Sequence, residues 1–336
     1  MLGKILETLY AKVFINIIVS DAQSTVYVES VSKGVVLSSE QEVFKTSNIN
    51  TEMFSYISEH IKQSPFHYIS ILDKSPKQGA VPSCENIENY VKSNTVNSIC
   101  VSNSWAYYTP KDDIKDMKYD YQTIGLDYIF SPFSILSKFF KDKINDQLAI
   151  FLLIEKKHIS LSVFDKSELL FAEYLDMQKD LEDDGLMIDI SMDDEDEISL
   201  DIGGIDLDDL DATTDDMGGL EDFSDIEELD GSDDIDEFAE AKDIQEITHQ
   251  EEKEDVSTDD MNEDYQRFVM IQDAISTFYN DDKYKSEFIE HIYIADSIGV
   301  SNDLKKYLEE EIFLSVFIRK IELDEELCEM AKAELG

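Results

Sequence analysis

The sequence contains little of what a disulfide-bonded, metal-binding or membrane-spanning protein needs. Its three cysteines, at 84, 100 and 328, are widely spaced and form no metal or disulfide pattern, which is typical of a reducing compartment. No apolar run reaches the ~18–20 residues of a membrane span. The first residues also lack the separate apolar core and cleavage site of a signal peptide. We therefore expect a cytoplasmic protein whose Cys84 and Cys100 pack as small apolar side chains.

Basic residues are scarce, and acidic residues are concentrated in one tract. The chain has 28 Lys and Arg against 76 Asp and Glu, which gives a net charge of -48. Of these acidic residues, 39 lie between residues 176 and 264, against three lysines. Phosphate backbones are bound by clusters of basic residues, so nucleic acid is excluded as a partner.

The acidic tract, residues 176–262, has too few apolar side chains to offset its chain entropy, and we expect a disordered insertion. Apolar residues nevertheless recur among the acids, as in IDLDDLD (205–211) and SDIEELD (224–230). Such alternation is typical of segments that fold on a partner, although a solvated spacer is an equal alternative. A calcium-binding loop is excluded, because no DxDxDG is followed by the required Glu.

Two parts of the chain have the same predicted element order, β-β-β-α-β-α-β. The first has strands at 13–19, 24–31, 35–38, 68–72 and 98–101 and helices at 51–62 and 84–92. The second has strands at 148–154, 158–164, 168–174, 292–295 and 315–318 and helices at 265–280 and 302–311. This order favours a duplicated α/β architecture over a generic α/β protein whose order repeats by chance. Between the two parts, residues 105–125 read as a loop and 133–144 as a helix.

Two C-terminal segments resemble a known family. Residues 267–280 (RFVMIQDAISTFYN) are similar to a PilM helix written roughly as E-I-x-R-S-L-x-F-Y. Residues 291–316 follow, without gaps, the pattern R-I-Y-L-S-G-G-x-x-L-x-P-G-L-x-x-Y-L-E-E-x-L-x-x-x-V. With the element order, they resemble the actin-like ATPase superfamily, and within it PilM of type IV pilus systems and the cytoplasmic domain of GspL in type II secretion.

The resemblance implies a two-lobed actin-like α/β fold. Its first lobe would be residues 1–145, with a partner-binding subdomain around 103–145. The second lobe would be residues 146–175 and 263–336. The disordered acidic insertion, 176–262, would replace a folded subdomain that the family has at this place.

The nucleotide motifs of the superfamily are degenerate in this sequence. Its two Asp-x-Gly phosphate loops and its glycine pair beside adenosine fall on Ser20 and Ala22, on Leu153 and Glu155, and on Asp296 and Ser297. A phosphate loop needs glycine so that backbone amides can approach the oxygens, and an acid to organise magnesium. These substitutions predict a pseudo-ATPase with no catalytic residue, cofactor or metal. An ATP-binding protein whose loops align differently is the alternative.

By the same resemblance, the protein would be a non-enzymatic scaffold of an envelope-spanning machine. It would form a ring or array in a flagellar motor, a type IV pilus or a type II secretion system. It would bind the cytosolic N-terminal tail of a PilN-like single-span protein, which pairs with a PilO-like protein, and lie peripherally at the inner face of the inner membrane. Aromatic residues of the first lobe would contact the tail, namely Trp105, Tyr107, Phe139 and Phe140. An adaptor that acts through its acidic tract is the remaining alternative.

Overall fold

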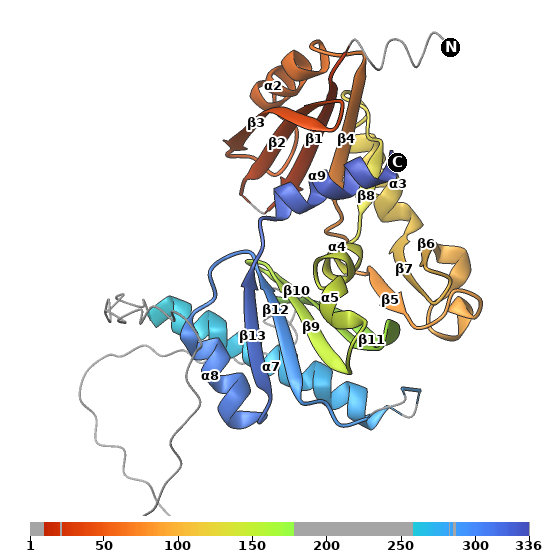
Figure 1. The fold of residues 1–336 in the computed structure, drawn as a ribbon, viewed down its shortest axis with the longest axis vertical. Helices are drawn as coiled ribbons and strands as arrows, with labels where there is room; N and C mark the ends of the chain where they lie inside the picture. The colour runs from red at the N-terminus through yellow and green to blue at the C-terminus, as the bar shows by residue number, and fades with distance from the viewer. Residues whose placement is uncertain (1–9, 21, 178–257, 282, 285–286, 336) are drawn as a thin grey trace, which may run out of the picture. The chain divides into compact units, whose positions relative to one another are not determined.

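Two five-stranded mixed sheets with the same strand order form the fold (Figure 1). The first sheet has the order β3-β2-β1-β4-β8 and consists of Val35–Phe44, Ser24–Ser32, Lys12–Val19, Phe66–Leu72 and Tyr128–Phe130. The second has the order β11-β10-β9-β12-β13 and consists of Glu168–Asp176, His158–Asp165, Ala149–Ile154, His291–Asp296 and Ser315–Lys320. In each sheet the first three strands are antiparallel, and the last two run parallel to the central one. The predicted duplicated α/β architecture is confirmed.

The central strands are continuous apolar runs because both of their faces are covered. Every residue of β9 is buried, and in β1 Val13, Ile15 and Ile17 lie in one core cluster while Phe14 lies in another. A strand covered on both faces lacks the alternation of apolar and polar residues that a half-exposed strand shows. The prediction that these two strands are central in separate sheets is therefore confirmed.

The computed structural model describes residues 10–20, 22–177, 258–281, 283–284 and 287–335. These residues belong to one compact unit, residues 1–186 with 255–336. The predicted acidic insertion lies outside the described residues, except for its first two residues and its last five. No helix in the described ranges combines the length and apolarity needed to cross a membrane.

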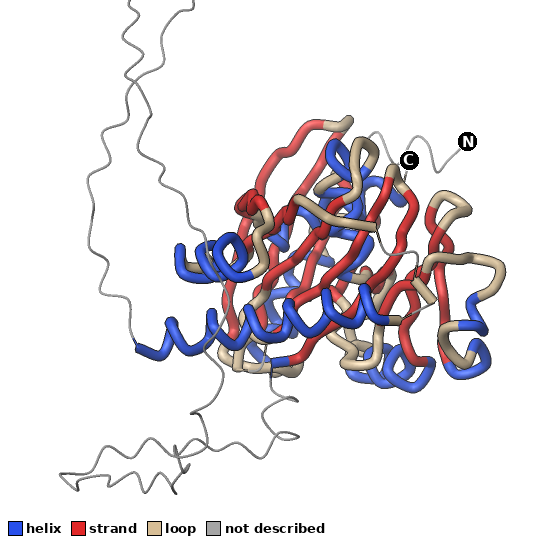
Figure 2. Tube along the Cα trace, turned by 90° about the horizontal axis from the view of Figure 1, so that it is seen from below, coloured by secondary structure: helices blue, strands red, loops and turns tan. Residues whose placement is uncertain are grey.

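Most of the predicted helices form, but only a 3-10 turn, Ile87–Asn89, lies within the helix predicted at 84–92. Three of the helices that form have side-chain caps, among them α4, which is capped by Ser131. Helix α2 (Thr51–Ile61) begins after Asn50, whose Oδ1 accepts the Met53 N–H at 2.8 Å. Helix α8 (Asn302–Glu311) begins after Ser301, whose Oγ accepts the Asp303 N–H at 3.0 Å. Helix α7 (Thr258–Asn280) begins seven residues before the predicted start at residue 265 and packs on β10, β11 and α8. Figure 2 shows α7 running along the strands of the second sheet.

A third, three-stranded sheet corrects the predicted first lobe. Its order is β5-β7-β6, from Gly79–Val81, Trp105–Pro110 and Val96–Val101. The predicted strand at 98–101 therefore belongs to this sheet, and β8 is the fifth strand of the first sheet. The segment read as a loop contains β7 and helix α3 (Lys111–Asp120). Strand β8 has three residues, which is too few to show a period.

A disulfide joins Cys84 to Cys100, which corrects the expectation that both cysteines are merely packed. Cys100 lies in β6, and Cys84 lies in the connection between β5 and β6. Their separation of 16 residues matches no motif, so only the fold of this small sheet brings them together. Cys328 is free and buried.

Two helices pack on the sheet of the other lobe. Helix α9 (Leu323–Glu334), predicted to belong to the second lobe, packs on β1, β2 and β4 of the first sheet (Figure 1). Helix α4 (Pro132–Phe139), predicted in the first lobe, packs on β9 and β10 of the second sheet. The predicted lobes, which assign α4 to the first lobe and α9 to the second, therefore do not follow the packing of these two helices. An apolar helix face in a sequence does not tell which sheet it covers.

Candidate functional site

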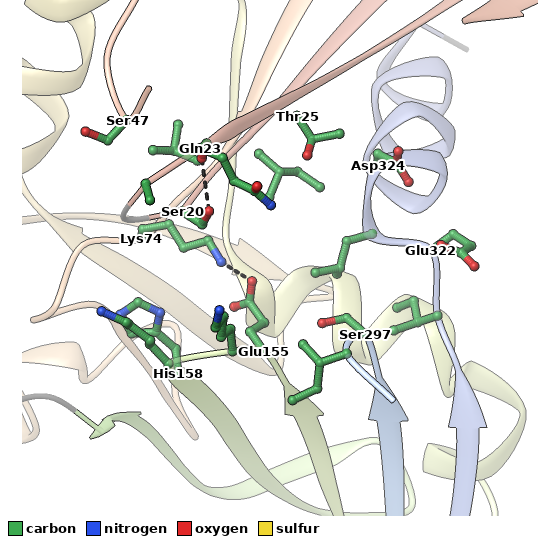
Figure 3. A pocket seen from close by; sticks show the side chains of 18 of the residues that line it. Ser20, Gln23, Thr25, Ser47, Lys74, Glu155, His158, Ser297, Glu322 and Asp324 are labelled. Carbon is green, nitrogen blue, oxygen red and sulfur yellow. Dashed lines mark hydrogen bonds and ion pairs between the residues drawn. The ribbon is translucent and has the colours of Figure 1, made fainter. Parts of the chain in front are cut away.

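A pocket of about 830 Å³ lies where the β1–β2 hairpin, the β9–β10 hairpin and the loops after β4, β12 and β13 meet (Figure 3). Its walls thus come from both sheets. Parallel strands that end at one edge commonly place a ligand site there. The lining residues that bear on the argument are Ser20, Ala22, Lys74, Glu155, His158, Ser297 and Asp324.

Four of the six predicted motif residues meet in this pocket: Ser20, Ala22, Glu155 and Ser297. Leu153 is fully buried in the core. Asp296 holds the loop after β12, because its carboxylate accepts the N–H groups of residues 298, 299 and 300 at 2.8–3.0 Å. Four of the predicted positions thus line one pocket, whereas the last two have structural roles.

The backbone amides at three of the four motif positions in the pocket donate within the chain rather than into the pocket. The Ser20 N–H donates to the Gln23 carbonyl at 2.8 Å, and the Ser20 hydroxyl donates to the same oxygen at 3.0 Å. The Glu155 N–H donates to the His158 carbonyl at 3.0 Å. The Ser297 N–H donates to the Ile154 carbonyl at 3.2 Å. A phosphate cradle requires such amides to be directed at the ligand.

An ion pair between Lys74 and Glu155 occupies the wall of the pocket (Figure 3). Lys74 follows β4 of the first sheet, and Glu155 begins the β9–β10 hairpin of the second. Their side chains are 21% and 7% exposed. Among the described residues, the second carboxylate oxygen of Glu155, Oε2, has no hydrogen-bond partner. The pair therefore joins the two sheets through a nearly buried negative charge.

The residue before Lys74 fixes the backbone of this loop. The Asp73 side chain is fully buried, and its carboxylate accepts the Ser75 N–H at 2.8 Å and the Thr109 hydroxyl at 2.6 Å. Burial raises the pKa of Asp73, although these two hydrogen bonds oppose the shift. Because Thr109 belongs to β7, Asp73 ties the loop that carries Lys74 to the third sheet.

His158 lies beside the ion pair and stays neutral. Its ring stacks on Tyr174 with 5.3 Å between centroids, and its Nε2 lies 3.9 Å from the Asp176 carboxylate. Burial lowers the pKa of His158 below its ordinary value, and the positive charge of Lys74 lowers it further. At neutral pH His158 therefore adds no second positive charge beside the Glu155 carboxylate, which is paired with Lys74.

Helix α9 connects the rim of the pocket to the first sheet. The Gln41 side chain of β3 donates to Asp324 Oδ2 at 2.6 Å, and Lys332 Nζ lies 2.5 Å from the Glu29 carboxylate of β2. Burial raises the pKa of Asp324. These contacts attach α9, which follows the last strand of the second sheet, to strands β3 and β2 of the first sheet.

Two family models match the sequence. A domain of unknown function, DUF8341, matches residues 150–336, and a second, DUF8569, matches residues 10–137. The chain belongs to the DUF8341 family. The DUF8341 segment contains the second sheet except Ala149, together with α9, and the segment that matches DUF8569 contains the first and third sheets. No curated protein matches this sequence.

Several solved structures are similar to this DUF8341 protein in fold alone. One is a protein "with actin-like ATPase fold and unknown function" from Bacteroides thetaiotaomicron, at 10% identity over 96% of each chain and a TM-score of 0.43. Another is a chain of the "PilM-PilN type IV pilus biogenesis complex", at 9% identity over 94% of each chain and a TM-score of 0.46. A third is MreB 5 of Spiroplasma citri bound to AMPPNP, at 10% identity over 96% of this chain and 95% of that chain, with a TM-score of 0.39.

The four aromatic residues predicted to bind a partner do not form one surface of this DUF8341 protein. Trp105 and Phe140 are core residues, 3% and 1% exposed, so neither presents its ring to a partner. They are buried because Trp105 packs edge-on against Phe164, and Phe140 packs against the aromatic side chains of the second sheet. Tyr107 and Phe139 are half-buried, and partner contact at these two residues stays a prediction.

Sequence reasoning missed Lys74 and Asp73. Both follow the buried strand Phe66–Leu72, and polar residues after a buried parallel strand are the available signal. Among the described residues, no group of three or more His, Cys, Asp or Glu could hold a metal ion. The observed arrangement of charges is suited to joining the two sheets.

Proposed function

We propose that this DUF8341 protein is a non-enzymatic scaffold of an envelope-spanning machine, similar to PilM. In this proposal it binds the cytosolic N-terminal tail of a PilN-like single-span protein and is held by that tail at the inner face of the inner membrane. The observation that carries the proposal is the Lys74–Glu155 ion pair in the pocket between the two sheets.

The ion pair disfavours a nucleotide in the pocket. A phosphate within about 4 Å of the Glu155 carboxylate meets a repulsion of about 4 kcal/mol at an effective dielectric constant of about 20. Lys74, which would offset that repulsion, is already paired with Glu155. The amides of Ser20 and Glu155 donate to their own hairpins, so they give a phosphate no compensating hydrogen bonds. Together these features favour a pseudo-ATPase.

Contacts between the two sheets favour one fixed arrangement of the lobes. A nucleotide cycle in a two-lobed protein requires the lobes to open and close. Here the Lys74–Glu155 pair, the Gln41–Asp324 hydrogen bond and the Lys332–Glu29 pair would all oppose opening. A static scaffold is consistent with this arrangement.

The choice of partner rests on the resemblance of the C-terminal segments to PilM. The fold similarity to a chain of the PilM–PilN complex is compatible with that choice. The machine would be a flagellar motor, a type IV pilus or a type II secretion system, and the scaffold a ring or array. A PilO-like protein would pair with the partner. Tyr107 and Phe139 are the proposed tail contacts.

A localisation assay tests the proposed partner. A fluorescent fusion of the full chain is followed in cells in which the PilN-like partner lacks its N-terminal cytosolic tail. We expect the envelope foci to disappear. Foci that persist contradict the proposal, and foci lost only on deletion of residues 178–257 would favour the acidic-tract adaptor instead.

A second function, ATP binding, is favoured by one observation. The pocket volume of about 830 Å³ falls within the range of ordinary ligand sites, about 300–1,000 Å³, and three lysines line it. Calorimetry with Mg-ATP decides between the two functions. We expect no saturable binding in the micromolar range, whereas clear saturation would replace the pseudo-ATPase with a nucleotide-binding protein.

A further inference from the structure

Two exposed phenylalanines precede neighbouring strands at the end of the second sheet opposite the pocket. Phe288 precedes β12 and is 78% exposed, and Phe313 precedes β13 and is 83% exposed. The two strands are parallel neighbours that begin together, with His291 beside Ser315. The Ser315 N–H donates to the Glu290 carbonyl at 2.9 Å, which joins the two loops. Each strand has six residues of ~3.3 Å, so the pocket lies roughly 20 Å away.

Phe313 has a backbone conformation that its residue type disfavours. Its φ is 61°, in the left-handed region, where a side chain with a Cβ is strained. It directly follows Ile312, the C-cap of α8, and this position after a helix is usually glycine. Because 83% of the residue is exposed, packing of the ring in the core does not offset the strain. Phenylalanine is thus unfavourable here for the isolated protein in both conformation and solvation.

The same loops carry acidic residues where a helix end disfavours them. The last turn of α8, which the structure describes in full, contains Glu309, Glu310 and Glu311 and no basic residue. A helix C-terminus carries a partial negative charge, so acids there are unfavourable. Lys305 offsets part of this charge through a 3.7 Å pair with Glu309. Glu287 and Glu290, on either side of Phe288, are also exposed.

We propose that this end of the second sheet, the Phe288–Phe313 surface, docks a positively charged apolar segment of a partner protein. The surface comprises Phe288, Phe313, the two loop glutamates at 287 and 290, and the three glutamates of the last turn of α8, at 309, 310 and 311. The left-handed backbone of Phe313 and the acids at the end of α8 both break local structural preferences at one exposed place. Such violations indicate a site that is kept for function rather than for stability. Exposed aromatic anchors within an acidic rim are complementary to a basic, apolar segment.

The charge of the surface also decides against other occupants. A second copy of this chain, with a net charge of -48, would be repelled by the five glutamates. An anionic lipid surface would be repelled in the same way. The site lies in the second lobe, away from the pocket and the proposed tail contacts, so this inference goes beyond the proposed function and does not depend on it.

Photo-crosslinking in cells tests the docking surface. A photoreactive amino acid replaces Phe288 or Phe313 in the full chain, and mass spectrometry maps the crosslinked segment. Phe54 of α2, which is 40% exposed, is the control position. We expect both positions to crosslink the same protein, through a segment of net positive charge, and the Phe54 position not to. Crosslinks to a second copy or to an acidic segment, or none at all, overturn the proposal.

The variant Phe313→Gly separates docking from a structural role. Relief of the left-handed strain should raise the melting temperature by about 2–4 °C, whereas crosslinking from position 288 should fall at least about tenfold. Lys166→Gly is the matched control, because Lys166 has a φ of 45° and an exposed side chain at a hairpin tip of the same sheet. It should also raise the melting temperature but leave crosslinking unchanged. A lower melting temperature for Phe313→Gly, or unchanged crosslinking from position 288, overturns the proposal.

Discussion

Removing either partner of the Lys74–Glu155 ion pair should cost far more than removing both. Lys74→Met leaves the Glu155 carboxylate, 7% exposed, without its partner, and Oε2 of that carboxylate has no other partner among the described residues. Breaking a buried pair costs about 3–5 kcal/mol. Because Lys74 is 21% exposed, solvent screens part of the pair, and we expect a loss of about 2–3 kcal/mol.

The complementary variant should be less severe. Glu155→Leu leaves Lys74, whose longer side chain can turn its ammonium group to solvent, and we expect a loss of about 1–2 kcal/mol. The double variant, Lys74→Met with Glu155→Leu, buries no unpaired charge and should fall within about 1 kcal/mol of the unmutated protein. The coupling energy between the two sites would then be about 2 kcal/mol or more.

Urea denaturation followed by circular dichroism at pH 7 measures the three free energies of unfolding. Equal m-values across the variants would show that compactness is unchanged, so that the differences report stability. Repeating the cycle in ~1 M salt should weaken the coupling only slightly, because salt screens a nearly buried pair poorly. Additive single substitutions, with a coupling below about 0.5 kcal/mol, would refute the ion pair as a link between the sheets.

Three further predictions concern α9, Tyr121 and the disulfide. Leu327→Ala removes a fully buried side chain of α9 and should lower the free energy of unfolding by about 2–5 kcal/mol in the same urea assay. Burial and the charge of Asp120 raise the pKa of Tyr121 to about 12, above its value of 10.0 in the unfolded chain. The contribution of neutral Tyr121 to stability is therefore fully present below pH 10 and is lost as the pH rises through 12. The melting temperature should fall over this pH range, and Tyr121→Phe should make the fall smaller. Cys84→Ser should cost about 2–4 kcal/mol and abolish any effect of a thiol reductant on melting, whereas unmutated protein that is insensitive to reductant would exclude the Cys84–Cys100 bond.

The fold could be predicted where local chemistry determines the local structure. The runs at 13–19 and 148–154 are apolar throughout because both faces of a central strand are covered. The helices predicted at 51–62 and 302–311 begin after Asn50 and Ser301, because these side chains accept a backbone N–H that would otherwise lack a partner. The repeated order of such elements predicted two similar sheets, although the fifth strand of the first sheet is β8 rather than residues 98–101.

What could not be predicted depends on contacts between residues far apart in the sequence. Nothing local in α9 distinguishes the first sheet from the second as its partner. Likewise, Cys84 meets Cys100 only after the third sheet folds, and Trp105 is buried by Phe164, 59 positions later. In the candidate site, the predicted motif positions located the pocket, but its main charge pair needs Lys74 from a different lobe.

The exchange of α4 and α9 between the sheets has a consequence for synthesis. Strands β1, β2 and β4 are all made before residue 73, but the helix that packs on them is not complete until residue 334. Until then Phe14 and its neighbours on that face lack the covering that α9 provides. A ribosome working at about 5–20 residues per second needs roughly 13–52 seconds for the intervening chain. The first half to be translated is therefore among the last parts to finish folding, and chaperones have most opportunity to act on it during that interval.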